Sequence, residues 1–365
     1  MNNALITGGA GFIGSNFIRF LLLIDPEIRI TNLDALTYAG SLTNLQELPD
    51  HSRHKFIRGD ICDRDLVTKI MLEHKIDTVV HFAAETHVDR SILGPERFIQ
   101  TNILGTFTLL DVALRTWQKV GLLDSYPTTQ LPRFHHISTD EVFGSLGPED
   151  SPWSETTPYA PNSPYAASKA ASDHLVRSYG HTYGLPYTIT NCSNNFGPHQ
   201  FPEKLIPLII LNAISGQSLP IYGDGKQIRD WLYVEDHCEA IWTVLKTSKS
   251  GKTYNIGGNN QPHNIAIVQM VCDILDELKP DSPYQPHSSL IKYVEDRPGH
   301  DRRYAMDISK IQQELGWKPR HTLSEALIKT VEWYLQHPEW IEAIRKESGY
   351  QDWLDKNYTN RGDES

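Results

Sequence analysis

Two short stretches contain side chains able to move protons. The segment STDEVFG, residues 138–144, places hydroxyls and two adjacent carboxylates directly after the apolar run 133–137. Tyr165 and Lys169 are four residues apart, so a helix would place both on one face. An ammonium near a phenol favours the phenolate, and we expect Lys169 to lower the pKa of Tyr165. The two stretches therefore predict acid–base chemistry on a small substrate.

The two carboxylates can serve one pocket only under a geometric condition. Successive residues of a strand point to opposite faces, so Asp140 and Glu141 can share a pocket only if the strand ends near Thr139. Residues 142–144 permit such a turn. Neighbouring carboxyls do not both ionise readily, so one can hold a proton at neutral pH, and the sequence leaves open which one. A solvated turn at the end of a strand is the alternative interpretation.

A glycine-rich turn near the N-terminus predicts a dinucleotide site. The segment TGGAGFIG, residues 7–14, lies between a strand-like and a helix-like run. Its glycines allow a tight turn and let the backbone approach a pyrophosphate at the helix N-terminus. Asp34 closes the second strand, where a carboxylate can accept from a ribose 2′-hydroxyl and would repel a 2′-phosphate. The pattern therefore favours NAD over NADP.

The elements that must position these residues alternate along the chain. We expect strands at residues 3–7, 28–34, 55–59, 77–84, 134–139 and 187–192. A helix is expected at 11–24, stopped by Asp25-Pro26, and the other intervals are long enough for crossover helices. This alternation predicts an α/β fold with a doubly wound parallel sheet of the Rossmann type.

The pattern loosens after residue 195, where prolines become frequent. We expect an NAD-binding Rossmann domain over 1–195, with returning segments near 228–260 that include strands at 231–234 and 253–256. We expect a smaller, mostly C-terminal α/β substrate domain over 196–227 and 261–350, with a helix near 265–278. Residues 351–365 are interpreted as a polar tail.

Composition and charge exclude several classes of partner. The 365-residue chain has a net charge of −11, which argues against binding to nucleic acid or to an anionic membrane. The apolar run 20–24 is too short to cross a bilayer. The four cysteines have no paired metal-ligand spacing, so we expect a cytoplasmic protein without a metal site. His135 and His136 are expected to be structural, and Trp231, Trp317 and Trp333 to be packing residues.

Taken together, the motifs resemble those of the extended short-chain dehydrogenase/reductase family. The glycine pattern GxxGxxG, the acidic end of the second strand, Thr139 and the YxxxK pair stand in the family's order, and the resemblance covers roughly residues 2–335. Three segments look most like the branch that dehydrates dTDP-glucose: HFAAETHVDRS at 81–91, STDEVFG at 138–144 and NCSNNFGPH at 191–199. Phe143 replaces the tyrosine that is more usual in this branch.

The resemblance implies a hydro-lyase of deoxysugar biosynthesis that uses NAD and recycles it. Oxidation of the sugar at C4 makes the C5 proton acidic, a base removes it while an acid protonates the departing C6 hydroxyl, and the hydride returns to C6. By resemblance Glu141 is this base and Asp140 the acid, Thr139 binds the C4 oxygen, and Tyr165 with Lys169 is the first base. A homodimer built from helices near 97–116 and 165–183 is also implied.

The resemblance assigns binding residues as well. The implied cofactor contacts are Gly8, Gly11, Phe12, Ile13, Gly14, Asp34, Leu36, Thr37, Asp60, Ile61, Ala83, Ala84, Thr101, Tyr165, Lys169 and Asn195. The implied sugar contacts are Thr86, Thr139 and Asn194, and the implied nucleotide-diphosphate contacts are Lys204, Leu205, Pro220, Tyr222, Arg229, Asn264 and His300. Asp60 serves either the adenine edge or a turn. The segment 296–302 either covers a ligand or only connects two elements.

Three alternatives remain open at this stage. A nucleotide-sugar 4-epimerase would share the fold, the cofactor and the Tyr165/Lys169 pair, but would not use an acid and a base at 140 and 141. A noncatalytic NAD-binding scaffold would be expected to lose Tyr165 or Lys169. A UDP-sugar is a possible substrate too, because one methyl group changes binding by only about 1–3 kcal/mol.

Overall fold

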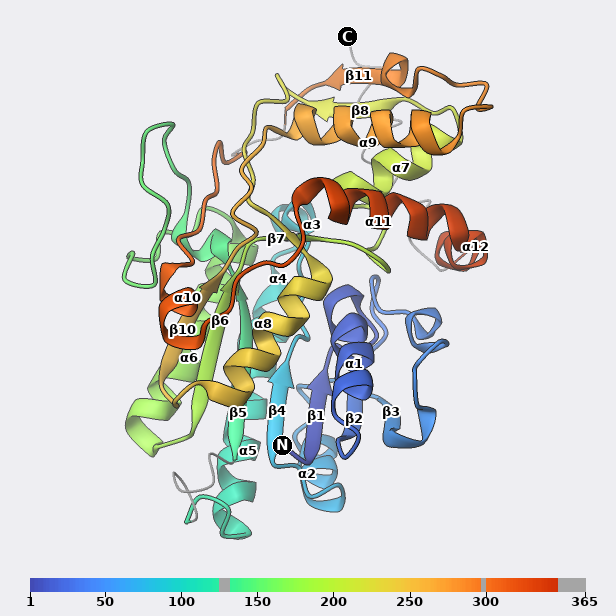
Figure 1. Ribbon diagram of the computed structural model, residues 1–365. Coiled ribbons are helices and arrows are strands. Elements are labelled where there is room, and N and C mark those ends of the chain that lie inside the picture. Colours follow the sequence, from blue (N-terminus) through green and yellow to red (C-terminus); the bar gives the residue numbers. More distant parts are fainter. Residues whose placement is uncertain (125–131, 297–299, 347–365) are drawn as a thin grey trace.

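The structure, a computed structural model, describes residues 1–124, 132–296 and 300–346, and a sheet of seven parallel strands forms its centre (Figure 1). In sheet order the strands are β10 (Lys252–Ile256), β6 (Tyr187–Cys192), β5 (Arg133–Thr139), β4 (Thr78–His81), β1 (Asn3–Thr7), β2 (Arg29–Asp34) and β3 (His54–Arg58). Every neighbouring pair runs parallel. The predicted doubly wound α/β sheet is therefore confirmed.

Helices cover both faces of the sheet. On one face lie α1 (Phe12–Ile24) and α8 (Val234–Thr247), and on the other lie α2 (Arg64–Glu73), α5 (Thr106–Lys119) and α6 (Pro164–Tyr183). Strand β1 shows why: Ala4 and Ile6 pack in the cluster of α1 and α8, whereas Leu5 packs in the cluster of α2, α5 and α6. A strand buried on both faces is rich in apolar residues without alternation, which explains the consecutive apolar residues 4–6.

A second layer lies over the carboxyl ends of the central strands (Figure 1). It contains α7 (Leu205–Ile214), α9 (Asn264–Leu278), α11 (Leu323–Gln336) and α12 (Pro338–Lys346), which share one apolar core, and the strand pair β8 (Leu219–Tyr222) and β11 (Ile291–Val294). The pair β7 (Asn194–Phe196) and β9 (Trp231–Tyr233) lies between the layers. The expected domain boundary at 195 falls inside β7, and the division into two domains stays a prediction.

The remaining elements are short and lie mostly in the connections. They are α3 (Val88–Leu93), α4 (Glu96–Phe98), α10 (Ser309–Leu315), the π-helical turn η3 (Ile99–Gly105), and the 3₁₀ turns η1 (Leu42–Leu45), η2 (His51–Arg53), η4 (Asp140–Phe143) and η5 (His287–Leu290). No helix within the described ranges combines the length and the apolar character that crossing a bilayer requires.

Most predicted elements are present, and their boundaries differ in two informative places. The strand expected at 77–84 ends at His81, which leaves residues 82–86 as a loop beside the ligand cavity described below. The helix expected near 97–116 is divided by the π-helical turn. His135 is buried in the central strand β5 and contacts Thr188, so it is structural as expected. The predicted tail at 351–365 lies outside the described residues.

Candidate active site

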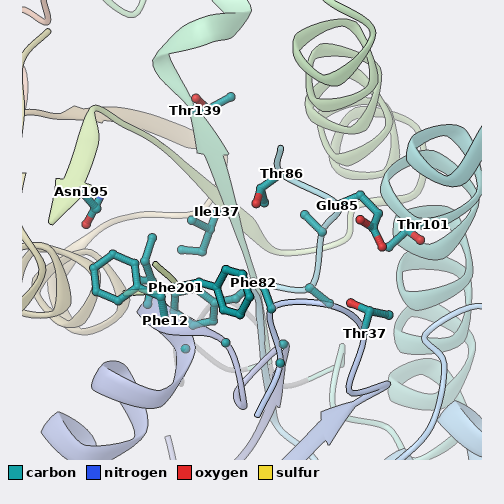
Figure 2. A pocket seen from close by; sticks show the side chains of 18 of the residues that line it. Phe12, Thr37, Phe82, Glu85, Thr86, Thr101, Ile137, Thr139, Asn195 and Phe201 are labelled. Carbon is teal, nitrogen blue, oxygen red and sulfur yellow. The ribbon is translucent and has the colours of Figure 1, made fainter. Parts of the chain in front are cut away.

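A cavity opens at the carboxyl ends of the parallel strands, where open α/β sheets bind their ligands (Figure 2). It encloses about 320 Å³ and is lined mainly by the carboxyl ends of β1 to β6 and the loops that follow them, together with Thr101, Tyr165, Lys169, Gln200, Phe201, Glu203 and Lys204. Figure 2 shows Thr139 at the end of its strand and the side chains of Phe12, Phe82 and Ile137 around the cavity. The cavity therefore collects residues that are far apart in the sequence.

The glycine-rich turn forms one end of the cavity. Gly8 has a φ of +73°, and a Cβ at Gly14 would lie 2.3 Å from the carbonyl oxygen of Gly8, so only glycine fits there without a shift. Gly11 is the N-cap of α1, whose first turn contains no acidic residue. The backbone N–H groups of this turn and the positive end of the helix are therefore suited to an anion.

Asp34 ties the glycine-rich turn to the end of β2. Its Oδ2 accepts from Ala10 N at 2.9 Å and its Oδ1 accepts from Leu36 N at 2.8 Å. Burial raises the pKa of Asp34, although both backbone hydrogen bonds oppose this effect. The carboxyl lines the cavity, whereas Leu36 is absent from the lining and contributes its backbone to the turn.

Asp60 combines the two interpretations that the sequence left open. Its Oδ1 accepts from Cys62 N at 2.8 Å, as expected of a residue that closes a turn. The same residue lines the cavity next to Ile61. A role for Asp60 toward a bound adenine stays a prediction, since the turn explains its local contacts.

The cavity brings together most of the predicted site residues. All predicted cofactor contacts except Leu36 line it, and so do Thr86, Thr139, Asn194 and Lys204. Sequence reasoning missed further lining residues: Leu33, Ala35, Tyr38, Ala39, Gly40, Gly59, Phe82, Glu85, Ile137, Ser138, Cys192, Ser193, Gln200, Phe201 and Glu203. Their shared signal is position, because nearly all lie within a few residues of the carboxyl end of a strand or beside Lys204.

The other predicted substrate contacts are absent from the lining of this cavity. These are Leu205, Pro220, Tyr222, Arg229, Asn264 and His300, and most of them belong to the second layer. The rings of Tyr222 and His300 contact each other, with centroids 6.2 Å apart. Of the segment 296–302, residues 297–299 lie outside the described residues, and His300 Nδ1 lies 2.6 Å from Asp296 Oδ1.

Arg229, one of these predicted nucleotide-diphosphate contacts, bears electrostatically on a residue of the cavity lining. Its guanidinium is buried, lies 4.1 Å from the ring centroid of Tyr304, and donates to the carbonyl of Asp301 at 2.9 Å. Its charge also lowers the pKa of Asp140, which lines the cavity. The structure therefore brings the predicted cation near the predicted acid.

The end of β5 fulfils the geometric condition derived from the sequence. The strand ends at Thr139, and η4 begins with the next residue. The Thr139 hydroxyl oxygen accepts from Glu141 N at 3.2 Å, which caps this turn. Because the extended backbone stops there, Asp140 and Glu141 line the same cavity.

The environment distinguishes the two carboxyls. Asp140 is buried, and burial raises its pKa well above the usual value, with the charges of Glu141 and Asp230 adding to the effect. Glu141 is only half-buried. Of the two carboxyls, Asp140 is therefore the one whose environment favours the protonated form.

Tyr165 and Lys169 lie in the first turns of α6, which begins as the sequence predicts. Ser163 caps the helix by accepting from Ala166 N at 3.1 Å, and Pro164 follows at the first position. Both Tyr165 and Lys169 are buried and line the cavity. The Lys169 ammonium donates to the carbonyl of Ile137 at 2.8 Å, so the helix is linked to the end of β5.

The expected lowering of the Tyr165 pKa by Lys169 is wrong for the protein alone. Burial raises the pKa of Tyr165 well above 10, and Glu141 adds to this, while a hydrogen bond with Thr139 opposes it. Burial also lowers the pKa of Lys169 to about 8. The chain therefore leaves the phenol neutral, and a phenolate would require further positive charge in the cavity.

Comparisons with known proteins agree with this arrangement. The sequence profile described as GDP-mannose 4,6 dehydratase matches residues 5–330. The dTDP-glucose 4,6-dehydratase of Xanthomonas campestris pv. campestris is 55% identical over 342 residues, which cover 93% of this chain and 95% of that protein. The dTDP-glucose 4,6-dehydratase of Streptomyces venezuelae, solved with NAD and TYD bound, is 43% identical with a TM-score of 0.83, covering 94% and 99% of the two chains.

An epimerase is also similar, at lower identity. The UDP-glucose 4-epimerase of Thermotoga maritima, solved with UDP-glucose, is 26% identical with a TM-score of 0.79, covering 92% of this chain and 99% of that chain.

Within the described ranges, no group of three or more His, Cys, Asp or Glu side chains could hold a metal ion.

The position of Asp34 predicts how the cavity selects its dinucleotide. Asp34→Asn keeps an acceptor for only one of the two backbone N–H groups of Ala10 and Leu36 and removes the negative charge, so we expect NAD affinity to fall about tenfold and NADP affinity to rise. Titration of both dinucleotides by fluorescence measures the two changes. Asp60→Asn is the matched control and should leave the preference for NAD unchanged. An unaltered NAD affinity in Asp34→Asn would remove Asp34 from the cofactor site.

Proposed function

The chain belongs to the family described as GDP-mannose 4,6 dehydratase, and from this premise we propose that it converts dTDP-glucose into dTDP-4-keto-6-deoxy-glucose with NAD as its cofactor. One observation carries the proposal: the buried Asp140, whose pKa is raised by burial, and a second carboxyl, Glu141, line one cavity with Tyr165 and Lys169. Elimination of water across C5 and C6 needs this combination of acid and base.

The residues present fit a bound dinucleotide. The turn leaves no room for a side chain at Gly8 or Gly14, beside the N-terminus of α1, which suits a pyrophosphate, and Asp34 suits a ribose. Solved relatives with NAD bound support this assignment. When bound, NAD would supply the hydride acceptor for the C4 hydrogen and the donor that returns it to C6.

Tyr165, Lys169 and Thr139 act at C4. Tyr165 takes the proton of the C4 hydroxyl as the first base, and the Thr139 hydroxyl binds the same oxygen. The charge of Lys169 favours the phenolate that this step needs. The oxidised nicotinamide ring also carries a positive charge, and such a charge acts against the high pKa that burial gives to Tyr165.

Asp140 and Glu141 act at C6 and C5. Once C4 is a ketone, the C5 proton is acidic because the resulting carbanion is conjugated with the carbonyl group. Glu141 takes this proton while Asp140 gives its own to the C6 hydroxyl, which leaves as water. Glu141 then returns its proton to C5 when the hydride arrives at C6, so Glu141 ends the cycle unchanged.

After one turnover, the protonation states of Tyr165 and Asp140 differ from those at the start. Tyr165 has gained a proton and Asp140 has lost one, so one proton must move between them before the next cycle. The Thr139 hydroxyl lies between the two groups: it hydrogen-bonds with Tyr165 and donates to Asp140 Oδ1 at 3.3 Å. Thr139 therefore offers a short route for this proton in addition to binding the C4 oxygen.

The second layer holds the nucleotide end of the substrate in this proposal. Lys204 and Arg229 provide the cations that a pyrophosphate needs, and Tyr222, Asn264 and His300 surround the nucleotide. The Asn264 side-chain oxygen is buried without a hydrogen-bond partner in the described part of the chain, so it has an acceptor to offer a ligand. The names of the most similar relatives support thymidine over uridine.

We also propose that the protein is a cytoplasmic homodimer. Helices α3 and α5 and the turn η3 expose large apolar side chains, among them Leu93, Leu104 and Phe107. Such a patch on the surface favours a protein contact. All four cysteines are free thiols, which suits a reducing compartment.

The reaction itself is tested by mass. Incubation of the purified protein with dTDP-glucose and a trace of NAD should lower the mass of the sugar nucleotide by one water without net formation of NADH. Mass spectrometry and absorbance at the NADH band provide the two readouts. An unchanged mass with a changed sugar configuration would instead assign the epimerase reaction, and an untouched sugar would refute the proposed substrate.

The two bases are separable by substitution. Tyr165→Phe should abolish the initial oxidation, because no group remains to take the C4 proton. Glu141→Gln should still reduce the cofactor in a single turnover but should lose about 10²–10⁴-fold in the rate of water loss. Stopped-flow absorbance at the NADH band with quenched product analysis measures both steps. Equal cofactor reduction in the two variants would contradict the division of roles.

The dimer is tested on its apolar patch. The double variant Leu104→Glu with Phe107→Glu should be monomeric, because two charges cannot be buried in an apolar contact. Light scattering after size exclusion gives the mass. Leu23→Glu on α1 is the matched control, since Leu23 is also exposed but lies outside the patch, and should remain dimeric. A monomeric wild-type protein would end this part of the proposal.

A further inference from the structure

A buried carboxylate outside the cavity lies one helical turn beyond Lys169. Asp173 follows Lys169 on α6 by four residues, so the two side chains project from the same helix face. The Asp173 side chain is fully buried and is absent from the cavity lining. A carboxylate in such a place is costly unless several donors surround it.

Asp173 contacts the end of β5, the strand that leads into η4 with the proposed acid and base. Its Oδ2 accepts from the Ser138 hydroxyl at 2.9 Å, and its Oδ1 lies 3.2 Å from His136 Nε2. Ser138 and His136 are the two neighbours of Ile137, whose carbonyl accepts from Lys169. Asp173 and Lys169, both on α6, therefore contact three consecutive residues of β5. These residues are 136–138, directly before Thr139.

Further donors reach Asp173 from the connection before α6 and from β6. The Tyr159 hydroxyl donates to Oδ2 at 2.7 Å, and Asn191 Nδ2 donates to the same oxygen at 3.4 Å. Arg177 donates to the Tyr159 hydroxyl at 3.0 Å and continues the same helix face. Burial opposes ionisation most strongly, but His136, Lys169 and Tyr159 outweigh it, and the pKa of Asp173 lies below its usual value.

We propose that Asp173 is a positioning residue of the reaction proposed above, on which this inference rests. Its carboxylate fixes the end of β5 against α6 and provides the fixed negative charge that keeps the Lys169 ammonium protonated. Through Lys169 it acts on Tyr165, and through Ser138 it sets the place of Thr139 and the turn that follows. Asp173 itself contacts neither the cavity nor the reacting atoms.

The other titratable groups around Lys169 carry no negative charge. Burial raises the pKa of Cys192, on β6, to about 12, so its thiol is neutral, and Tyr165 is neutral for the same reason. Burial lowers the pKa of His136, on β5, to about 4, and that of His81, on β4, well below its usual value. Among the described groups that bear on Lys169, Asp173 alone is therefore an anion at neutral pH.

This charge decides the protonation state of Lys169 near neutral pH. Burial lowers the Lys169 pKa to about 8, and Asp173 is the largest contribution in the opposite direction. A group that must be protonated loses its effect as the pH rises through its pKa. Without Asp173 the Lys169 pKa falls, so the protonated form is lost at a lower pH.

A titration of Lys169 tests the proposal directly and without substrate. The Cε signals of ¹³C-lysine-labelled protein are followed by NMR against pH, and the signal that is missing in Lys169→Met identifies Lys169. Asp173→Asn keeps the size of the side chain and removes its charge. We expect the Lys169 midpoint to fall by at least about one pH unit, a tenfold change in the protonation equilibrium. An unchanged midpoint would overturn the proposal.

The pH profile of the reaction gives a second, independent readout. The alkaline limb of kcat/KM for dTDP-glucose should move to lower pH in Asp173→Asn, with a rate close to wild type at pH 6 and about fivefold lower at pH 8 for a fall of one pH unit. Tyr159→Phe is the matched control, because it removes one donor but leaves the carboxylate charge, and its alkaline limb should not move. A loss of equal size at every pH would assign Asp173 a structural role only.

The two measurements separate the failure of this inference from that of the proposed function. If the wild-type protein leaves dTDP-glucose untouched, the proposed function fails while the Lys169 titration still decides the role of Asp173. If Asp173→Asn does not fold, as judged by circular dichroism, Asp173→Ser replaces it in the same titration, since its small side chain leaves room for water beside the donors. The expected fall of the midpoint is the same.

Discussion

The point at which β5 stops is the constraint on which the site depends. If the extended backbone continued past Thr139, Asp140 and Glu141 would face opposite sides of the sheet. The Thr139 side chain caps a 3₁₀ turn at that residue, and Gly144 closes the turn with a φ of +96°, where a Cβ would lie 2.5 Å from the carbonyl of Ala160. The same strand end also holds Lys169 through the carbonyl of Ile137. The proposed acid, the proposed base and the Tyr165/Lys169 pair are therefore arranged around one short stretch of backbone.

Burial raises the pKa of both Asp140 and Tyr165, which suits a proposed acid but not a proposed base. It raises the pKa of Asp140, which favours the protonated form that the proposed acid needs. It raises the pKa of Tyr165 too, which works against a proposed base that must lose its proton. A low-dielectric cavity cannot satisfy both needs by burial alone, so local charge has to separate the two groups. Lys169 and the anion that keeps it charged, Asp173, lie on the side of the tyrosine.

In the proposed function, the two layers of the fold bind different parts of the ligands. The loops at the carboxyl edge of the sheet form the cavity with the glycine-rich turn and Asp34, and the second layer contains Tyr222, Asn264 and His300. Arg229 joins them, because it packs on Tyr304, donates to Asp301 and bears electrostatically on Asp140. A ligand that reached from Arg229 to Asp140 would place its reactive end at the junction of the layers, where Thr139 lies.

The sequence by itself determined what depends on local spacing. The separation of Tyr165 and Lys169 follows from the helical period, the glycines at 8, 11 and 14 from the needs of a tight turn, and Asp34 from the length of a βαβ unit. These features predicted the fold and carried the family resemblance, and the resemblance in turn implied most of the contacts that line the cavity. The sequence also set the condition that β5 must end near Thr139, but local residues only permitted that turn.

Only the tertiary structure decided the pKa shifts of the site residues and the contacts between residues that are far apart in the sequence. The pKa of Asp140 is raised because its side chain is buried, whereas Glu141 is only half-buried, and burial is a property of the whole fold. For the same reason Tyr165 has a raised pKa, against the expectation from its neighbour Lys169. Asp173 meets Ser138 across 35 residues and Tyr159 across 14, and no period of a helix or strand relates such positions. Only the packing of α6 on β5 brings them together.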